Sequence, residues 1–216
     1  MTTLILVRHG QSVGNLQGLY CGQLDFPLSE KGVAQAELTG AYLKENYQID
    51  AIYSSDLSRA MQTAEPTAKA FGLETVPEKD LREICVGEWE GQNADEVIHK
   101  YSKEYDLWRT QTDYAPKGGE TREQMQERVE RCLKKILSEN EGKTVAVFTH
   151  CGTIGHLFTA LIPDAKTRRA LFDSREIYNA AVTVVHVDKG EFVDCPAFGS
   201  FEHLVGLATS TDLKTV

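Results

Sequence analysis

Short apolar runs separated by polar loops are the first regularity in the chain, and each run is long enough for one buried strand. Four runs are bounded by polar or turn-forming residues, at positions 4–7, 51–54, 145–149 and 181–187. A shorter candidate lies near 73–76, and the turn Asp188-Lys189-Gly190 leads into a predicted edge strand near 191–193. The runs predict a sheet whose central strands are buried on both faces.

Helical stretches lie between these runs. Ser29 is a good N-cap for a helix that continues to about Glu45. A second helix is expected to follow a cap at Ser55-Asp56 and to stop at Gly72. The pattern thus places one helix after each of the first two strands.

A third helix is predicted by a capping box, in which Thr121 is followed three residues later by Gln124. This helix continues to about Ser138, and apolar residues recur along it at helical spacing, namely Met125, Val129, Cys132, Leu133, Ile136 and Leu137. A further helical stretch is expected at 154–161, directly after the strand at 145–149.

Strands that alternate with helices predict an α/β fold in three layers, α/β/α, with a mostly parallel central sheet and helices on both faces. A chain of 216 residues with 41% hydrophobic content fits a single domain over 1–216. The stretch from Cys85 to Gly119 carries both tryptophans and scattered charge. We predict that this insertion, at about 85–119, packs as a small lid over the strand C-terminal ends.

Composition limits the cellular location and the binding partners that are expected for this chain. With 23 basic against 32 acidic residues, the net charge of −9 argues against nucleic acid or anionic lipid as a partner, so an anion site must be local. Five cysteines without CxxC spacing suggest neither a disulfide framework nor a zinc site. The chain starts without a basic leader and has no membrane-length apolar run, so a cytoplasmic location is expected.

The candidate chemistry begins where two apolar runs end. Arg8-His9-Gly10 follows the first run, and His150 follows the run at 145–149. Parallel sheets bind ligands beyond the carboxyl ends of their strands, so the two histidines are expected to converge on one site. A fixed cation beside a nucleophile is suited to phosphate.

Phosphate chemistry fits the neighbouring residues as well. Arg8 and Arg59 both follow predicted strands, and a guanidinium matches phosphate oxygens better than a lysine ammonium does. A neutral His9 could then attack phosphorus while His150 donates to the phosphate oxygens. Loop amides near three further positions would add donors, at Gly10, Asn15 and Gly152.

The leaving alkoxide needs a proton, and Glu83 is the candidate donor. Because arginines and histidines can neutralise the transferred group, neither a metal nor another cofactor is needed. Glu88 and Glu90 are the alternatives for the proton donor. The remaining histidines, at 99, 156, 186 and 203, are expected in the core or on the surface.

Four ordered blocks of sequence resemble the histidine phosphatase superfamily, in its phosphoglycerate-mutase-like branch. They are Arg8 to Ser12 with Asn15, Tyr53 to Ala64, Leu81 to Gly91, and Thr149 to Gly152. The resemblance implies that His9 carries the phosphoryl group, that Glu83 is the proton donor, and that Arg8, Arg59 and His150 form the phosphate pocket. It also matches substrate-pocket positions to Asn15, Cys21, Gly22 and Gly152.

Departures from the family pattern favour hydrolysis over mutase chemistry. The mutases carry an aromatic-containing tetrad after their glutamate and a paired-arginine segment in a longer insertion. Here Glu83 is followed by Ile84-Cys85-Val86, and the insertion has no adjacent arginines, although it carries basic residues such as Arg109, Lys103 and Lys117. Gln11 and Cys151 also depart from the usual motifs without removing an essential group.

Three functions follow from these residues. The leading one is a metal-independent phosphomonoesterase that acts through a phosphohistidine on a small phosphorylated metabolite. The alternatives are a cofactor-dependent phosphoglycerate mutase and a non-catalytic phosphometabolite-binding protein.

An exposed edge strand near Glu191 could pair between subunits, which leaves a homodimer open. Trp108 is expected to anchor the insertion, whereas Trp89 could either anchor it or line the pocket.

Overall fold

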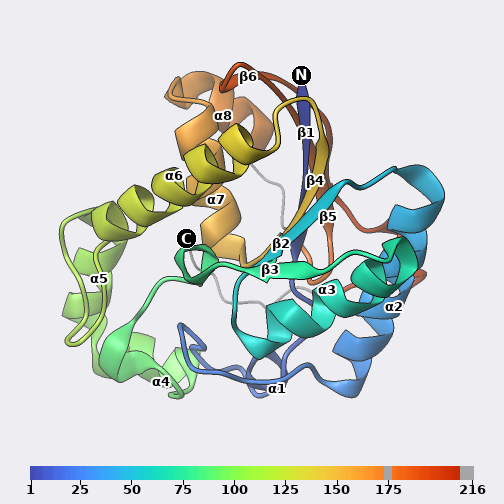
Figure 1. Cartoon of the computed structure of the whole chain (residues 1–216). Coiled ribbons are helices and arrows are strands. Elements are labelled where there is room, and N and C mark those ends of the chain that lie inside the picture. The colour runs from blue at the N-terminus through green and yellow to red at the C-terminus, as the bar shows by residue number, and fades with distance from the viewer. Residues whose placement is uncertain (173–176, 210–216) are drawn as a thin grey trace.

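A single mixed sheet forms the centre of the computed structural model, which describes residues 1–172 and 177–209 (Figure 1). Its strands, in the described part of the chain, are β1 Thr2–Arg8, β2 Ala51–Ser54, β3 Thr75–Pro77, β4 Thr144–Thr149, β5 Val182–Asp188 and β6 Glu191–Ser200. They lie in the order β3-β2-β4-β1-β5-β6. The first four run parallel, whereas β5 and β6 are antiparallel to their neighbours. The mostly parallel sheet is confirmed.

Alternate residues of β1 face different helices, which explains the unbroken apolar run. Leu4 and Leu6 pack in the cluster that contains the buried side of α6 Arg122–Glu139 and α7 Cys151–Leu161. Ile5 and Val7 pack in the cluster that contains residues of α2 Glu30–Asn46 and α3 Ser58–Phe71. Figure 1 shows these two helix pairs on opposite sides of the sheet. The predicted three layers are therefore present.

Two predicted helix starts are confirmed and one is corrected. Ser29 caps α2, and Thr121 forms the expected capping box with Gln124 at the start of α6. The expected cap of α3 at Ser55-Asp56 is wrong, because the N-cap residue is Leu57 and has no side chain that can accept. The amide of Ser58 instead donates to Asp25 at 2.8 Å, a contact from a distant loop. Gly72 ends α3 with a φ of 67°, as predicted.

Four of the described helices were not expected. The glycine-rich loop after β1 contains α1 Val13–Leu16, a single turn too short to show a periodic pattern. The second is α8 Ala165–Phe172, which follows α7. The other two, α4 Ala94–Lys100 and α5 Ser102–Thr110, lie in the insertion. The other elements are the 3-10 turns η1 Lys79–Leu81, η2 Gly87–Trp89 and η3 Glu202–Leu204.

The segment 85–119 contains η2, α4 and α5, and it is anchored by aromatic side chains. Trp89 and Trp108 are 0% and 4% exposed, with ring centroids 5.8 Å apart. Both belong to the same apolar cluster as Met125 of α6. Anchoring by Trp108 is thus confirmed, and Trp89 is buried in the same way.

The sheet ends on one side at β6, as expected for an edge strand near Glu191. Pro196 lies within β6 and lacks an amide hydrogen, and the pairing of β6 with β5 contains register shifts. Both features interrupt the free edge. None of the helices within 1–172 and 177–209 combines the length and the apolar character needed to cross a lipid bilayer.

Replacing Met125, which is fully buried in α6, should test the packing of this helix on the sheet. Met125→Ala is expected to lower the free energy of unfolding by about 2–5 kcal/mol, because it leaves a cavity. The control is Glu127→Ala on the exposed side of the same helix, with an expected change within about 0.5 kcal/mol. Denaturant unfolding measures both, and equal effects would contradict the assigned helix face.

Candidate active site

Three neighbouring parallel strands end at the same edge of the sheet and carry the candidate residues. Arg8 is the last residue of β1 and lies opposite Thr149 of β4. The amide of His9 donates to the carbonyl of Thr149 at 2.8 Å, and the amide of Ser55 donates to Phe148 at 2.9 Å. Main-chain hydrogen bonds thus hold the ends of β1, β4 and β2 together. The rings of His9 and His150 lie 5.0 Å apart, so the predicted convergence is confirmed.

His9 is oriented by its own backbone. Its Nδ1 lies 2.7 Å from the carbonyl oxygen of Gly10, and since a carbonyl only accepts, Nδ1 must carry the proton. The lone pair of the neutral ring is therefore on Nε2. Burial, followed by the positive charges of Arg59 and Arg8, lowers the pKa of His9 well below its ordinary value of 6.5. The ring is neutral at physiological pH.

His150 is fully buried and bonded to Ser55, whose Oγ lies 2.9 Å from Nε2. The same hydroxyl accepts a 3.4 Å hydrogen bond from the amide of Leu57 and keeps its own proton available for Nε2. When Ser55 donates to Nε2, the ring proton of His150 is on Nδ1, which has no partner among the described residues. Burial, and then Arg59, lower the pKa of His150 well below 6.5. His150 is a neutral ring beside His9.

Arg59 is 1% exposed and held by two carbonyl oxygens. Nη1 donates to Leu24 and Nη2 to Gly22, both at 2.8 Å, while Nε has no partner in the described part of the chain. Burial lowers its pKa from 12.5, and a guanidinium remains charged. Gly22 has a φ of +46°, and an added Cβ would lie 2.2 Å from a carboxylate oxygen of Glu90. Only glycine fits where this loop meets Arg59.

Arg8 is 5% exposed, and its Nη1 donates to the carbonyl of Ile177. Its charge acts on both His9 and His150 by lowering their pKa. The two arginines and two histidines predicted for a phosphate pocket are thus one buried group.

Glu83 lies against the start of α7. One carboxylate oxygen accepts from the amide of Gly152 at 3.1 Å, and the other accepts from the amide of Ile84 at 2.9 Å. A Cβ at position 152 would lie 2.4 Å from Glu83 Oε1, so the glycine makes room for the carboxylate. Glu90 is bonded to the amides of Gln23 and Val86. Glu88 is exposed.

The loop amides expected as phosphate donors are engaged within the protein. The amide of Gly10 donates to Thr63 at 2.9 Å, and that of Asn15 donates to Ser12 at 3.0 Å. The amide of Gly152 holds Glu83, as described above. The expectation is wrong for these three amides, because the Thr63 hydroxyl within α3, the Ser12 cap of α1 and the Glu83 carboxylate accept their hydrogen bonds.

Asn15 and Cys21 lie together, and Asn179 connects Asn15 to His9. Asn15 Oδ1 accepts from the Ser12 amide at 3.1 Å and from Asn179 at 3.4 Å, while Nδ2 lies 4.0 Å from Cys21 Sγ. Asn179 also donates to the carbonyl of His9 at 3.1 Å. Burial raises the pKa of the Cys21 thiol. Cys151 is the first residue of α7, directly after His150.

The other histidines lie in the packed structure or on its surface. His99 is exposed, His186 contacts Asp194 at 2.7 Å, and His203 stacks on Tyr42. His156 bonds to Gln126, and burial lowers its pKa to about 4. Over residues 1–172 and 177–209, no three His, Cys, Asp or Glu side chains are grouped to hold a metal ion.

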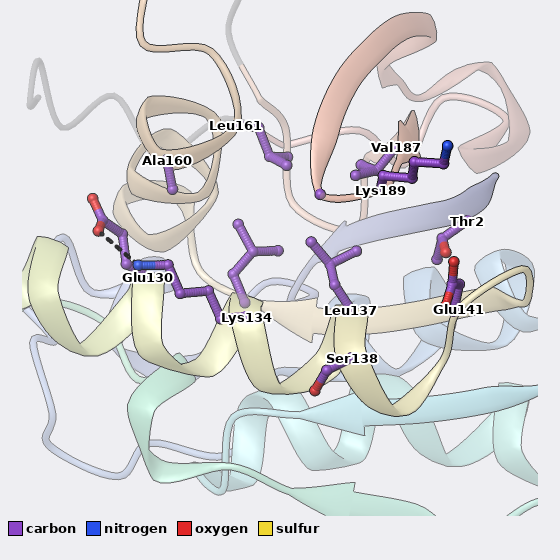
Figure 2. Close-up of a pocket in the computed structure, with 12 residues that line it drawn as sticks. Thr2, Glu130, Lys134, Leu137, Ser138, Glu141, Ala160, Leu161, Val187 and Lys189 are labelled. Carbon is purple, nitrogen blue, oxygen red and sulfur yellow. Dashed lines mark ion pairs between the residues drawn. The ribbon is translucent and has the colours of Figure 1, made fainter.

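A pocket of about 560 Å³ lies far from this chemistry, between α6, α7 and the turn that joins β5 to β6 (Figure 2). Its floor includes Leu133, Leu137 and Leu161, and Thr2 at the start of β1 also lines it. It lies toward the amino end of β1, opposite the end that carries His9. None of the candidate catalytic residues lines it.

Sequence reasoning missed the roles of Ser55 and Thr63, although both lie in a block quoted for the family. Ser55 could have been found, because it follows a strand parallel to the two that carry the histidines. Thr63 donates to Arg59 O at 2.6 Å and accepts from Gly10, a contact made only in the folded chain.

A buried, neutral histidine beside two guanidinium groups is suited to phosphoryl transfer, and comparisons with known proteins agree. The model of the histidine phosphatase superfamily (branch 1) matches residues 4–194, so the chain belongs to this family. It is a phosphoric monoester hydrolase by class. Its relatives include both phosphatases and mutases.

Two curated relatives illustrate that range. Phosphoserine phosphatase 1 of Hydrogenobacter thermophilus is 34% identical over 190 residues, covering 88% of each chain. A phosphoglycerate mutase of Schizosaccharomyces pombe is 33% identical, covering 88% of this chain and 92% of the relative. Among solved structures, Bacillus stearothermophilus YhfR superimposes with a TM-score of 0.84 at 33% identity, over 94% of this chain and 100% of that one.

The hydrogen bond between Ser55 and His150 can be tested by binding. Ser55→Ala leaves Nε2 of the buried His150 without its partner, which frees the ring to change tautomer. We expect the inhibition constant of inorganic phosphate to rise about tenfold. Ser54→Ala is the matched control, since within 1–172 and 177–209 the Ser54 hydroxyl bonds only to the Ser55 carbonyl, at 2.8 Å. Equal constants in the two variants would refute the role of Ser55.

Proposed function

We propose that the chain is a metal-independent phosphomonoesterase that hydrolyses a small phosphorylated metabolite through a phosphohistidine at His9. One observation carries the proposal: a neutral His9, with its lone pair on Nε2, lies in a pocket with two guanidinium groups. A phosphate dianion bound by Arg8 and Arg59 would be largely neutralised and open to attack.

In the first half of the reaction, Nε2 of His9 forms a bond to phosphorus as the bond from phosphorus to the ester oxygen breaks. The proton on Nδ1 of His150 stabilises the equatorial oxygens. Glu83, in its protonated form, gives its proton to the departing alkoxide. The products are an alcohol and phosphohistidine.

In the second half, Glu83 is a carboxylate and takes a proton from water. The water oxygen bonds to phosphorus, the bond to Nε2 breaks, and its electron pair returns to His9. Inorganic phosphate leaves, and Glu83 is again protonated. No metal is needed, since the protein supplies the cations.

Around this centre we propose that Asn15, Cys21, Gly22 and Gly152 line the substrate pocket, and that residues 85–119 form a lid over it. Gly152 would act through the room and the amide that it gives to Glu83. Five cysteines without CxxC spacing fit a reducing, cytoplasmic setting. A homodimer through β6 would use the part of the strand before Pro196.

Mutase activity is the second candidate, favoured by the name of the S. pombe relative. In a mutase the phosphoryl group would return to a bound phosphorylated acid. The segment 85–119 lacks adjacent arginines, which favours transfer to water. With 3-phosphoglycerate and catalytic bisphosphate, phosphate release should exceed isomerisation; the reverse ratio would establish the mutase instead.

A metabolite phosphatase panel run with and without EDTA tests the proposal. Wild-type activity on at least one phosphomonoester, including phosphoserine, should survive chelation. It should fall by at least about a thousandfold in His9→Ala, because the nucleophile is lost. His99→Ala, a change at an exposed histidine of α4, serves as control. No turnover on any substrate would favour the non-catalytic binding protein.

A further inference from the structure

The loop that carries Glu83 has few hydrogen bonds of regular secondary structure, since it lies between the short turns η1 and η2. Arg128, from the middle of α6, reaches into this loop. Its Nη1 donates to the carbonyls of Asp80 and Arg82 at 2.8 and 2.7 Å, and its Nη2 donates to the carbonyl of Glu83 at 3.0 Å. One guanidinium thus binds three main-chain oxygens, and the last of them belongs to Glu83, the proposed proton donor.

Glu120 binds both Arg128 and the main chain that follows Glu83. Its carboxylate accepts from Arg128 Nη2 at 2.6 Å and from Nε at 2.9 Å. The same carboxylate accepts from the amide of Cys85 at 2.9 Å and from the Gln23 side chain at 3.3 Å. The side chains of Arg128 and Glu120 are only 11% and 16% exposed. The pair therefore holds the main chain both at Glu83 and two residues after it.

We propose that Arg128 and Glu120 are positioning residues that fix Glu83 for proton transfer. Neither takes part in the chemistry, and the inference rests on the proposed function of Glu83. With the main chain fixed on both sides, the carboxylate is directed to the amide of Gly152, two residues after His150. A displacement of about 1 Å in such a group can cost about a hundredfold in rate.

The planar guanidinium group of an arginine is required for this role. The contacts use Nη1, Nη2 and Nε in fixed relative directions, which the single ammonium of a lysine cannot reproduce. Arg131 lies one turn further along α6 and pairs with Asp80 at 2.9 Å, but its side chain is 66% exposed. Arg131 is therefore the matched control.

The leaving group distinguishes positioning from general damage. An alkyl phosphate needs a proton on its departing oxygen, whereas the p-nitrophenolate of an aryl phosphate leaves without one. We expect Arg128→Met to lower kcat/KM for β-glycerophosphate by about 10- to 100-fold and that for p-nitrophenyl phosphate by less than about threefold. Glu83→Gln should show the same selectivity, and Arg131→Met should change neither value.

Arg128→Lys and Glu120→Gln are the second variants. The lysine keeps the positive charge that acts on His150 but loses the fork, so the same selective loss is expected. They replace Arg128→Met if its thermal unfolding shows that it does not fold. Equal losses on both substrates, or no loss on either, would overturn the inference. If the wild-type protein hydrolyses neither of these phosphates nor any other phosphomonoester of the panel, the proposed function fails and not the positioning alone.

Discussion

The site depends on positive charge gathered where parallel strands end. Arg8 and Arg59 are almost completely buried, and their charges help to keep His9 and His150 neutral by lowering the pKa of each. Burial costs a guanidinium much of its hydration, and carbonyl oxygens replace only part of it. The same charges keep the ring of His9 neutral, with its lone pair on Nε2.

Loops far apart in the chain are joined to build this arrangement. The carbonyls of Gly22 and Leu24 hold Arg59, while Glu90 binds the amides of Gln23 and Val86. The loop around Arg59 and the loop after Glu83 are thus connected through one carboxylate. Arg82 adds a two-pronged contact to Asp56, with both distances at 2.6 Å. These contacts connect the loop that holds Arg59 to the loop that carries Glu83.

Local chemistry in the sequence predicted much of this structure. The runs at β1 and β4, the Ser29 cap and the box at Thr121 depend on neighbouring residues, and the pairing of β1 with β4 follows from parallel topology. What could not be predicted depends on distant partners. Asp25, from a distant loop, accepts from the amide of Ser58 at the start of α3, and the amide of Gly152 donates to Glu83. The bonds of Arg128 to the Glu83 loop likewise form only when α6 packs beside it.

The neutral state and tautomer of His9 test the account most directly. In protein labelled with ¹⁵N-histidine, NMR should show His9 with its proton on Nδ1 and no protonation as the pH is lowered from 7.5 to about 6. The His9→Gln variant identifies its signals. A ring that titrates near the ordinary pKa of 6.5, or one with its proton on Nε2, would contradict the account.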